Sequence, residues 1–125
     1  MTILDASAVL AFVRSEPGSE TVISVIETAR ISAVNLGEIV SKMMDWRIDA
    51  ATAREQIDAL NLPVIPFDRE LAIAAGLLRA QTSHLGLSFG DRACLATAKA
   101  EGAPVMTTDR NWAKLELDID IQVIR

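Results

Sequence analysis

Short apolar runs alternate with longer segments of helical periodicity along this chain of 125 residues. Runs that are typical of buried strands lie at 2–4, 31–34, 62–67, 104–107 and 119–124. The segments between them predict helices at 6–14, 20–29, 36–46, 50–60, 69–82 and 91–101, with a further helical turn at 111–115. Strands that alternate with helices form βαβ units. We therefore expect an α/β fold with a mainly parallel central sheet and helices on both faces.

Three local signals refine this prediction. Pro17 and Gly18 interrupt the periodicity and mark a loop. Asp49 is a preferred N-cap residue in front of the helix predicted at 50–60. The prolines within 62–67 cannot donate backbone hydrogen bonds, so this strand is predicted to lie at an edge of the sheet.

Length and composition predict a single domain over residues 1–125, since no repeat, low-complexity segment or Gly/Ser linker divides the chain. Half of the residues are hydrophobic, yet no run approaches the roughly 18 apolar residues of a membrane span. Met1 leads directly into the first predicted strand, so no signal peptide is expected. The single cysteine, Cys94, cannot form an internal disulfide. We therefore expect a soluble cytoplasmic protein that does not contact membranes.

Acidic and amide side chains follow the predicted strands. Asp5 comes after the first strand, Asn35 and Glu38 after the second, Asp68 after the third and Asp109 after the fourth. The carboxyl ends of parallel strands share one edge of a sheet, and ligands bind outside that edge. The sequence therefore predicts a cluster of acidic side chains there.

Several of these acids also have a purely structural interpretation. Asp is a preferred N-cap, so Asp5, Asp68, Asp91 and Asp109 could each satisfy helix N–H groups. Asp91 differs from the others because it leads a stripe of residues that are predicted to face the core, namely Cys94, Leu95 and Ala98. A carboxylate that tends inward needs a partner or a metal ion.

Glu38 lies on the polar face of the helix predicted at 36–46. The apolar stripe of that helix is predicted to consist of Leu36, Ile39, Val40 and Met43, and the opposite face to hold Glu38 with Asn35, Lys42 and Asp45. The structural interpretation of this pattern is a solvated helix face.

Four stretches of the chain resemble the motifs of one known family. They read ILDASAVLAFV, NLGEIVSKM, GLSFGDRACLATA and VMTTDRNW, from Ile3 to Trp112. In order and approximate spacing they are similar to the PIN-domain ribonucleases, and more narrowly to the VapC toxins of bacterial toxin–antitoxin pairs. A single match of a strand followed by Asp would be weak, whereas four separated matches in one short chain are specific.

The resemblance implies which residues form the active site. Its acidic set, carried over position by position, is Asp5, Glu38, Asp91 and Asp109, which would act as catalytic residues and metal ligands. Ser7, Asn35 and Thr107 stand where the family has polar residues near the site. Oxygen ligands without His or Cys suit Mg²⁺ or Mn²⁺ rather than zinc. The only histidine, His84, is predicted to be a surface residue in a loop.

The implied activity is metal-dependent hydrolysis of RNA phosphodiester bonds by an endoribonuclease that is the toxin of a toxin–antitoxin pair. The implied partners are an RNA substrate, a cognate antitoxin protein and a second copy in a homodimer. The alternative is a catalytically silent PIN-fold module that binds RNA or protein. A haloacid-dehalogenase-type phosphatase would need Asp-x-Asp after the first strand, where this chain has Asp5, Ala6 and Ser7.

The net charge of −5 and the lack of a basic stretch argue against a broad electrostatic surface for nucleic acid. Without the four acids of the predicted site the net charge would be −1. Four basic residues near these acids in the sequence could contact phosphates, namely Arg14, Lys42, Arg92 and Arg110. Their alternative interpretation is solvated surface or ion pairing.

Overall fold

Five parallel strands form one sheet in the computed structural model, which describes residues 1–125. The strands lie in the order β3-β2-β1-β4-β5. Their bounds are β1 Thr2–Leu4, β2 Ala29–Ser32, β3 Val64–Ile65, β4 Val105–Thr107 and β5 Ile121–Val123. The expected α/β fold is confirmed, and every strand pair is parallel. The strand with flanking prolines, β3, lies at an edge, as predicted.

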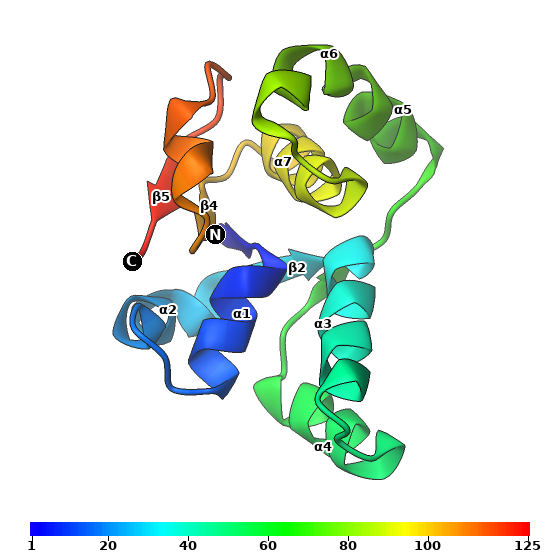
Figure 1. Ribbon diagram of the computed structural model, residues 1–125, viewed down its shortest axis with the longest axis vertical. Helices are drawn as coiled ribbons and strands as arrows, with labels where there is room; N and C mark the ends of the chain where they lie inside the picture. Colours follow the sequence, from blue (N-terminus) through cyan, green and yellow to red (C-terminus); the bar gives the residue numbers. More distant parts are fainter.

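Helices cover both faces of the sheet (Figure 1). One group lies below the sheet in that view and consists of α1 Ala6–Val13, α2 Ser19–Val25, α3 Ala33–Asp45 and α4 Ala50–Leu60. The other lies above it and consists of α5 Arg69–Leu77, α6 Arg79–Thr82 and α7 Phe89–Glu101. Three short 3₁₀ helices complete the chain, namely η1 Ile26–Thr28, η2 Ser83–Leu85 and η3 Arg110–Lys114. None of the helices combines the length and the hydropathy that a bilayer crossing would require.

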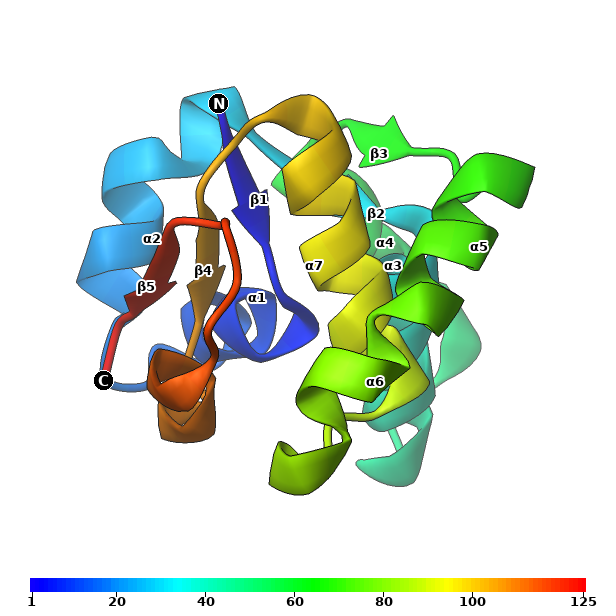
Figure 2. The ribbon, with the colours of Figure 1, turned by 90° about the horizontal axis from the view of Figure 1, so that it is seen from above.

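Each face of the sheet has its own hydrophobic core, because successive strand residues point to opposite faces. In β1, Leu4 joins the core under α1 and α3, whereas Ile3 joins the core under α7. In β4, Met106 and Val105 divide between the two cores in the same way. Figure 2 shows β1 and β4 side by side, with α7 and α1 on their two sides.

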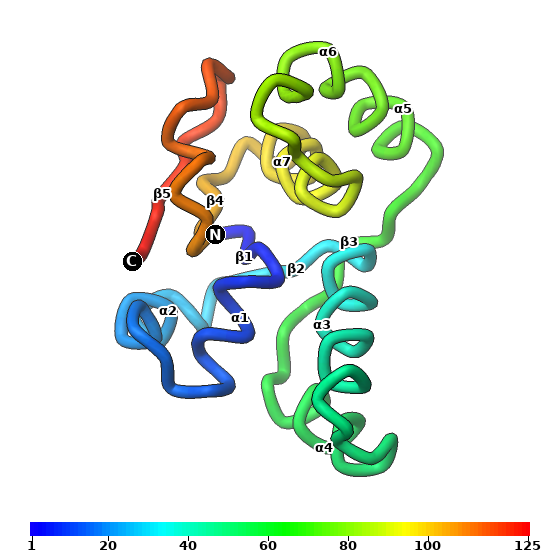
Figure 3. Tube along the Cα trace, in the orientation of Figure 1, coloured from blue at the N-terminus to red at the C-terminus, as the bar shows by residue number.

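The chain order creates a switch point between β1 and β4. From β1 the chain adds β2 and then β3 on one side, and it returns to place β4 on the other side of β1. The tube in Figure 3 follows this return along α5, α6 and α7, from β3 to β4. Ligands of open parallel sheets bind where the order of strands reverses, outside the carboxyl ends of the strands. A ligand site is therefore expected at the carboxyl ends of β1 and β4.

The second strand was predicted two residues too late. Strand β2 spans Ala29–Ser32 rather than 31–34, and the helix predicted at 20–29 ends as α2 at Val25. Ser32 is the N-cap of α3, since its Oγ accepts a hydrogen bond from the Val34 N–H at 3.2 Å. The apolar residues after Ser32 thus continue into the helix. As a consequence Asn35 lies within the first turn of α3 and not at the strand end.

Two helix boundaries also differ from the prediction. The helix predicted at 69–82 is divided into α5 and α6, which meet at Leu78. The helix predicted at 91–101 begins at Phe89 and has Ser88 as its N-cap. Asp49 and Asp68 are N-caps as predicted, with their carboxylates accepting bonds from Thr52 N and Leu71 N.

Candidate active site

The carboxylate of Asp5 does not cap the helix that follows it. Asp5 occupies the N-cap position of α1, yet its side chain accepts no bond from the helix N–H groups. Instead its Oδ2 accepts hydrogen bonds from Ser7 Oγ at 2.6 Å and from Thr107 Oγ1 at 2.9 Å. Asp5 is only 5% exposed. A buried carboxylate held by two hydroxyl groups at the switch point favours the functional interpretation of Asp5.

These three residues, Asp5, Ser7 and Thr107, form the Asp5 network, which ties β1 to β4. Ser7 Oγ accepts a hydrogen bond from the Thr108 N–H at 3.0 Å and lies 3.3 Å from Thr107 Oγ1. Thr107 Oγ1 in turn accepts one from the Asp109 N–H at 3.1 Å. The predicted supporting residues Ser7 and Thr107 therefore contact Asp5 directly, and no hydrogen bond engages Asp5 Oδ1.

A second network holds Glu38. The side chain of Asn35 donates from Nδ2 to Glu38 Oε1 at 2.6 Å and to the Gly90 carbonyl oxygen at 3.0 Å. We call these three residues, Asn35, Glu38 and Gly90, the Asn35 network. It joins α3 to the first turn of α7. Asn35 Oδ1 is buried without a hydrogen-bond partner.

The polar face predicted for α3 was partly wrong. Asn35 is fully buried, in line with Ile39 and Met43, whereas Val40 is 37% exposed. Residues four apart share a helix face, so Asn35 belongs to the buried stripe and Val40 does not. Glu38 is half-buried, since it lies at the border of that stripe.

Asp91 is part of the capping box of α7. The Asp91 N–H donates to Ser88 Oγ at 3.2 Å, and Asp91 Oδ2 accepts from the Ser88 N–H at 2.9 Å. The pattern of Ser88 followed three residues later by an acid is a sequence signal for a helix start. Asp91 Oδ1 makes no hydrogen bond, so one oxygen of this half-buried carboxylate is free for a ligand. The predicted inward stripe of α7 is confirmed, because Cys94, Leu95 and Ala98 are fully buried.

Burial and charge act together on Asp5. Removal from water raises the pKa of Asp5 from its ordinary value of 3.8 to about 6, against the lowering effect of the Ser7 and Thr107 hydrogen bonds. The charges of Asp91 and Glu38 raise it further. Burial raises the pKa of the Cys94 thiol as well, and Asp5, Asp91 and Glu38 add to that effect. Three of the four predicted acids, namely Asp5, Glu38 and Asp91, are thus close enough to influence one another's surroundings electrostatically.

Asp109 is placed differently. Its carboxylate caps η3, with Oδ1 accepting from the Asn111 N–H at 2.9 Å. Its connection to Asp5 runs through its backbone N–H and Thr107. The capping interpretation therefore describes its side chain in this structure.

The donor chemistry of the site suits a hard cation, since it consists of carboxylate and amide oxygens. Each of the four acids keeps one oxygen without a hydrogen bond, namely Asp5 Oδ1, Glu38 Oε2, Asp91 Oδ1 and Asp109 Oδ2. No three His, Cys, Asp or Glu side chains lie close enough together to hold a metal ion as they stand. The predicted metal-binding role of the four acids stays a prediction.

Comparison with known families agrees with this geometry. The family model of the PIN domain matches residues 2–117 of the sequence. This chain belongs to the PIN-domain family. A search of the curated proteins returned no match.

Solved structures of toxin–antitoxin proteins share this PIN fold. VapBC2 from Rickettsia felis, bound to a DNA fragment of its promoter, has a TM-score of 0.76 and 16% identity, over 97% of this chain and 96% of that one. A toxin–antitoxin complex from Klebsiella pneumoniae has a TM-score of 0.75 and 15% identity, over 93% of each chain. VapC20 from Mycobacterium tuberculosis, described as a sarcin–ricin-loop-cleaving toxin, has a TM-score of 0.71 and 15% identity, over 91% of this chain and 94% of that one. The predicted resemblance to PIN domains and VapC-type toxins is confirmed in family and fold.

The four basic residues predicted to contact phosphates differ in how strongly other groups of this PIN domain already engage them. Arg92 is only 6% exposed, and its Nη1 donates to the Ala75 carbonyl oxygen at 2.9 Å, so it does not fit the predicted phosphate contact. Arg14 stacks over the Trp46 ring at 4.2 Å. Arg110 donates to the carbonyl oxygen of the last residue. Lys42 is exposed and forms no ion pair.

Proposed function

We propose that this chain, as one PIN domain over residues 1–125, is a divalent-metal-dependent endoribonuclease and the toxin of a toxin–antitoxin pair. The observation that carries the proposal is the carboxylate of Asp5. It is buried at the switch point and turned away from the helix it precedes, with one oxygen held by two hydroxyl groups and the other without a hydrogen bond. An aspartate needed only as a cap would direct its carboxylate to the N–H groups of the helix, which Asp5 does not do.

Membership of the PIN family and the likeness to VapC-type toxins support the proposal. One similar protein is described as a toxin that cleaves the sarcin–ricin loop, and another solved structure is a toxin–antitoxin complex. By analogy we propose a cognate antitoxin, a homodimer and a cytoplasmic location for this chain. These assignments rest on likeness rather than on the contacts within the site.

In the proposed mechanism Asp5, Glu38 and Asp91 would hold the principal Mg²⁺ or Mn²⁺ ion, and Asp109 would complete the cluster or support a second ion. Such an ion supplies an activated water and neutralises charge on the phosphate. Ser7 and Thr107 orient Asp5 by occupying its Oδ2, which leaves Oδ1 available. The Asn35 amide orients Glu38 by donating to its Oε1. The reaction is hydrolysis, in which a water oxygen bonds to phosphorus and the P–O bond of the RNA ester breaks.

The proposal predicts that Asp5→Asn abolishes Mg²⁺-dependent cleavage of RNA and relieves the growth arrest that the wild-type protein causes when it is produced alone in bacteria. Asn keeps the shape of the side chain but lacks the charge that binds a cation. The measurements are RNA cleavage with Mg²⁺ or EDTA and growth after induction. A folded Asp5→Asn variant that cleaves RNA as fast as the wild type would overturn the proposal.

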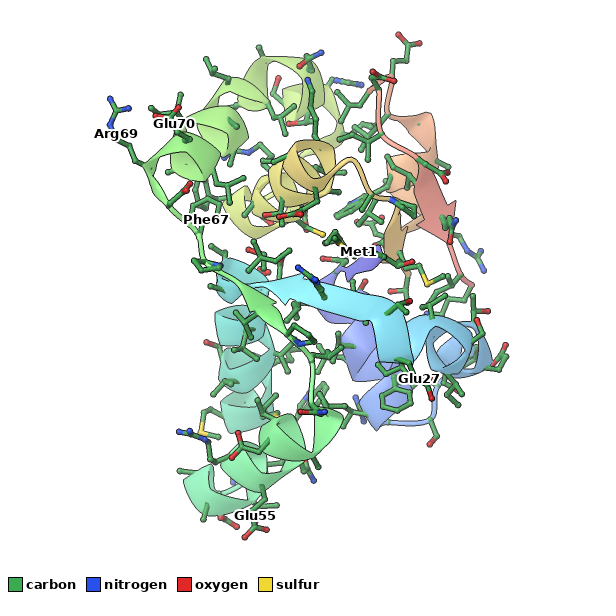
Figure 4. All side chains as sticks on the ribbon, turned by 180° about the vertical axis from the view of Figure 1, so that it is seen from behind. Met1, Glu27, Glu55, Phe67, Arg69 and Glu70 are labelled. Atoms are coloured by element: carbon green, nitrogen blue, oxygen red, sulfur yellow. The ribbon has the colours of Figure 1, made fainter.

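The matched control is Asp68→Asn. Asp68 caps α5, next to Arg69 and Glu70, whose paired side chains point outward (Figure 4). Because Asn is an equally good cap, cleavage should be unchanged. Wild-type protein that binds RNA but leaves it intact in Mg²⁺ and in Mn²⁺ would instead identify a catalytically silent PIN-fold module.

A further inference from the structure

Gly90 is a glycine whose position leaves no room for a side chain. It is buried in the first turn of α7, and a Cβ atom built on it would overlap the Glu38 carboxylate, of which Oε1 would lie 2.6 Å away. Its φ is not positive, so the backbone conformation does not require glycine. A Cβ on Gly37 or Gly76, which also lie in helices, would meet no atom within 4 Å. The requirement at Gly90 is therefore for space, and Glu38 occupies that space.

Asn35 ties the same two residues together. Its fully buried Nδ2 donates to Glu38 Oε1 and to the Gly90 carbonyl oxygen, so both of its amide hydrogens are used. The carboxylate of Glu38 thus accepts a hydrogen bond from the Asn35 amide and packs against the backbone of Gly90, which has no side chain.

On the basis of the proposed function, we propose that Gly90 is a positioning residue for Glu38. The space left by its missing side chain, together with the Asn35 amide, holds the Glu38 carboxylate against the first turn of α7. Asp91 follows Gly90 directly in the chain, so this arrangement brings two of the proposed metal ligands to the same helix turn.

Gly90→Ala is expected to move Glu38 without unfolding the domain. The atoms that a Cβ would meet are at the far end of a flexible side chain, which can rotate away, and not in the backbone. Alanine is also the better helix former. The helix propensity of alanine opposes the loss of the Asn35–Glu38 hydrogen bond, so the apo protein should stay folded and melt within several degrees of the wild type, while the metal site loses an oriented ligand.

The experiment is a set of thermal melts in EDTA and across a titration with Mn²⁺ alone. A cation that binds only the folded state raises the melting temperature by mass action, and the wild type should gain several degrees. Changes to residues that orient metal ligands typically weaken metal affinity 10- to 100-fold. Gly90→Ala should therefore need at least about ten times more Mn²⁺ to raise its melting temperature above its own EDTA value by as much as the wild type.

Two further variants isolate the role of Gly90. Gly37→Ala, within α3, should show the wild-type Mn²⁺ response, because a Cβ there meets nothing. In a Glu38→Ala background, Gly90→Ala should cause no additional loss of Mn²⁺ affinity, since no carboxylate remains to be displaced. Such non-additivity is expected of residues that act through one contact.

The outcomes separate this inference from the proposed function. If the wild type responds to Mn²⁺ and Gly90→Ala responds equally, the positioning role of Gly90 is wrong and the proposed function stands. If Gly90→Ala melts lower in EDTA but keeps its Mn²⁺ affinity, Gly90 serves only packing and the inference is overturned. If the wild type itself shows no response at millimolar Mn²⁺, the metal site of the proposed function fails and the inference fails with it.

Discussion

The aspartates that follow β1 and β4 have similar local positions, but their carboxylates have different roles. In both, a strand is followed by an aspartate at the N-cap position of a helical turn, with extended backbone at Asp5 and at Asp109. Asp109 caps its turn through the Asn111 N–H, whereas Asp5 makes no such bond and is buried among hydroxyl groups. One carboxylate stabilises the local chain. The other is held instead by the Ser7 hydroxyl of α1 and the Thr107 hydroxyl of the neighbouring strand β4.

The difference shows that an N-cap position does not decide what its side chain does. A carboxylate takes the donors that its surroundings offer. Asp5 lies at the carboxyl end of the central strand β1, where the hydroxyls of Ser7 in α1 and Thr107 in β4 both donate to it. Asp109 lies half-buried beyond the end of β4, and its carboxylate accepts only from its own helical turn. The buried acid is destabilising when charged and suited to bind a cation, whereas the capping acid already uses one of its two oxygens, Oδ1, within its own turn.

The largest expected effect comes from removing the charge of Asp5. With a folded-state pKa of about 6 and an unfolded value of 3.8, the folded state retains its proton longer. Below about pH 4 the Asp5 side chain therefore does not lower the free energy of unfolding. Its destabilising effect grows between pH 4 and 6, and above pH 6 it reaches about 3 kcal/mol. Asp5→Asn should be more stable than the wild type by about this amount at pH 7.5 in EDTA, as measured by urea unfolding, and the difference should vanish towards pH 4.

Asp49→Asn is a control of opposite sign. Hydrogen bonds from Thr52 lower the pKa of Asp49, so its charge stabilises the folded state above its unfolded pKa, and this stability is lost as the pH falls. Asp49→Asn should be less stable than the wild type near neutral pH and equal to it in acid. A stability difference for Asp5→Asn that stays constant with pH would show that burial does not disfavour its charge.

An intermediate effect is expected from Thr107→Val. The fully buried Thr107 hydroxyl donates to Asp5 Oδ2 and accepts from the Asp109 N–H, so valine leaves both groups without this partner. The free energy of unfolding should fall by roughly 2 kcal/mol, as measured by urea unfolding. The pKa of Asp5 should rise further, because the Thr107 hydrogen bond lowers it. The neighbouring Thr108→Val, whose side chain makes no hydrogen bond, should change stability by less than about 0.5 kcal/mol, and equal losses in the two variants would contradict the assignment.

The smallest effect is expected at Asp109. Asp109→Ala should lower the free energy of unfolding by about 1 kcal/mol through loss of the cap, while Asp109→Asn should leave it nearly unchanged, because Asn caps as well as Asp does. Chemical denaturation of the metal-free protein measures both. If Asp109→Asn were instead clearly more stable than the wild type, repulsion from the other acids would outweigh capping at this position.

The sequence predicted the order of strands and helices, the parallel sheet and the position of β3 as an edge strand. It also predicted that the candidate site lies at the carboxyl ends of the strands. These features follow from rules that act over a few residues or from the order of elements along the chain, such as hydrophobic period, prolines in a strand and the shared carboxyl edge of βαβ units. The errors in the element bounds arose where local signals overlap, as at Ser32, which ends β2 and also caps α3.

Only the tertiary structure decided how individual polar side chains are used. Thr107 reaches Asp5 across 102 positions of sequence, Asn35 reaches Gly90 across 55 and Arg92 reaches Ala75 across 17. These contacts decide that Asp5 is not a cap, that Asn35 is buried and that Arg92 is an internal structural residue. They also make Gly90 the residue that faces Glu38, which nothing indicates in the local sequence beyond a glycine in the first turn of a helix. Capping, solvation and metal binding compete for the same carboxylates. For Asp5 the outcome depends on a local donor, Ser7, together with Thr107, which only the folded chain brings to it.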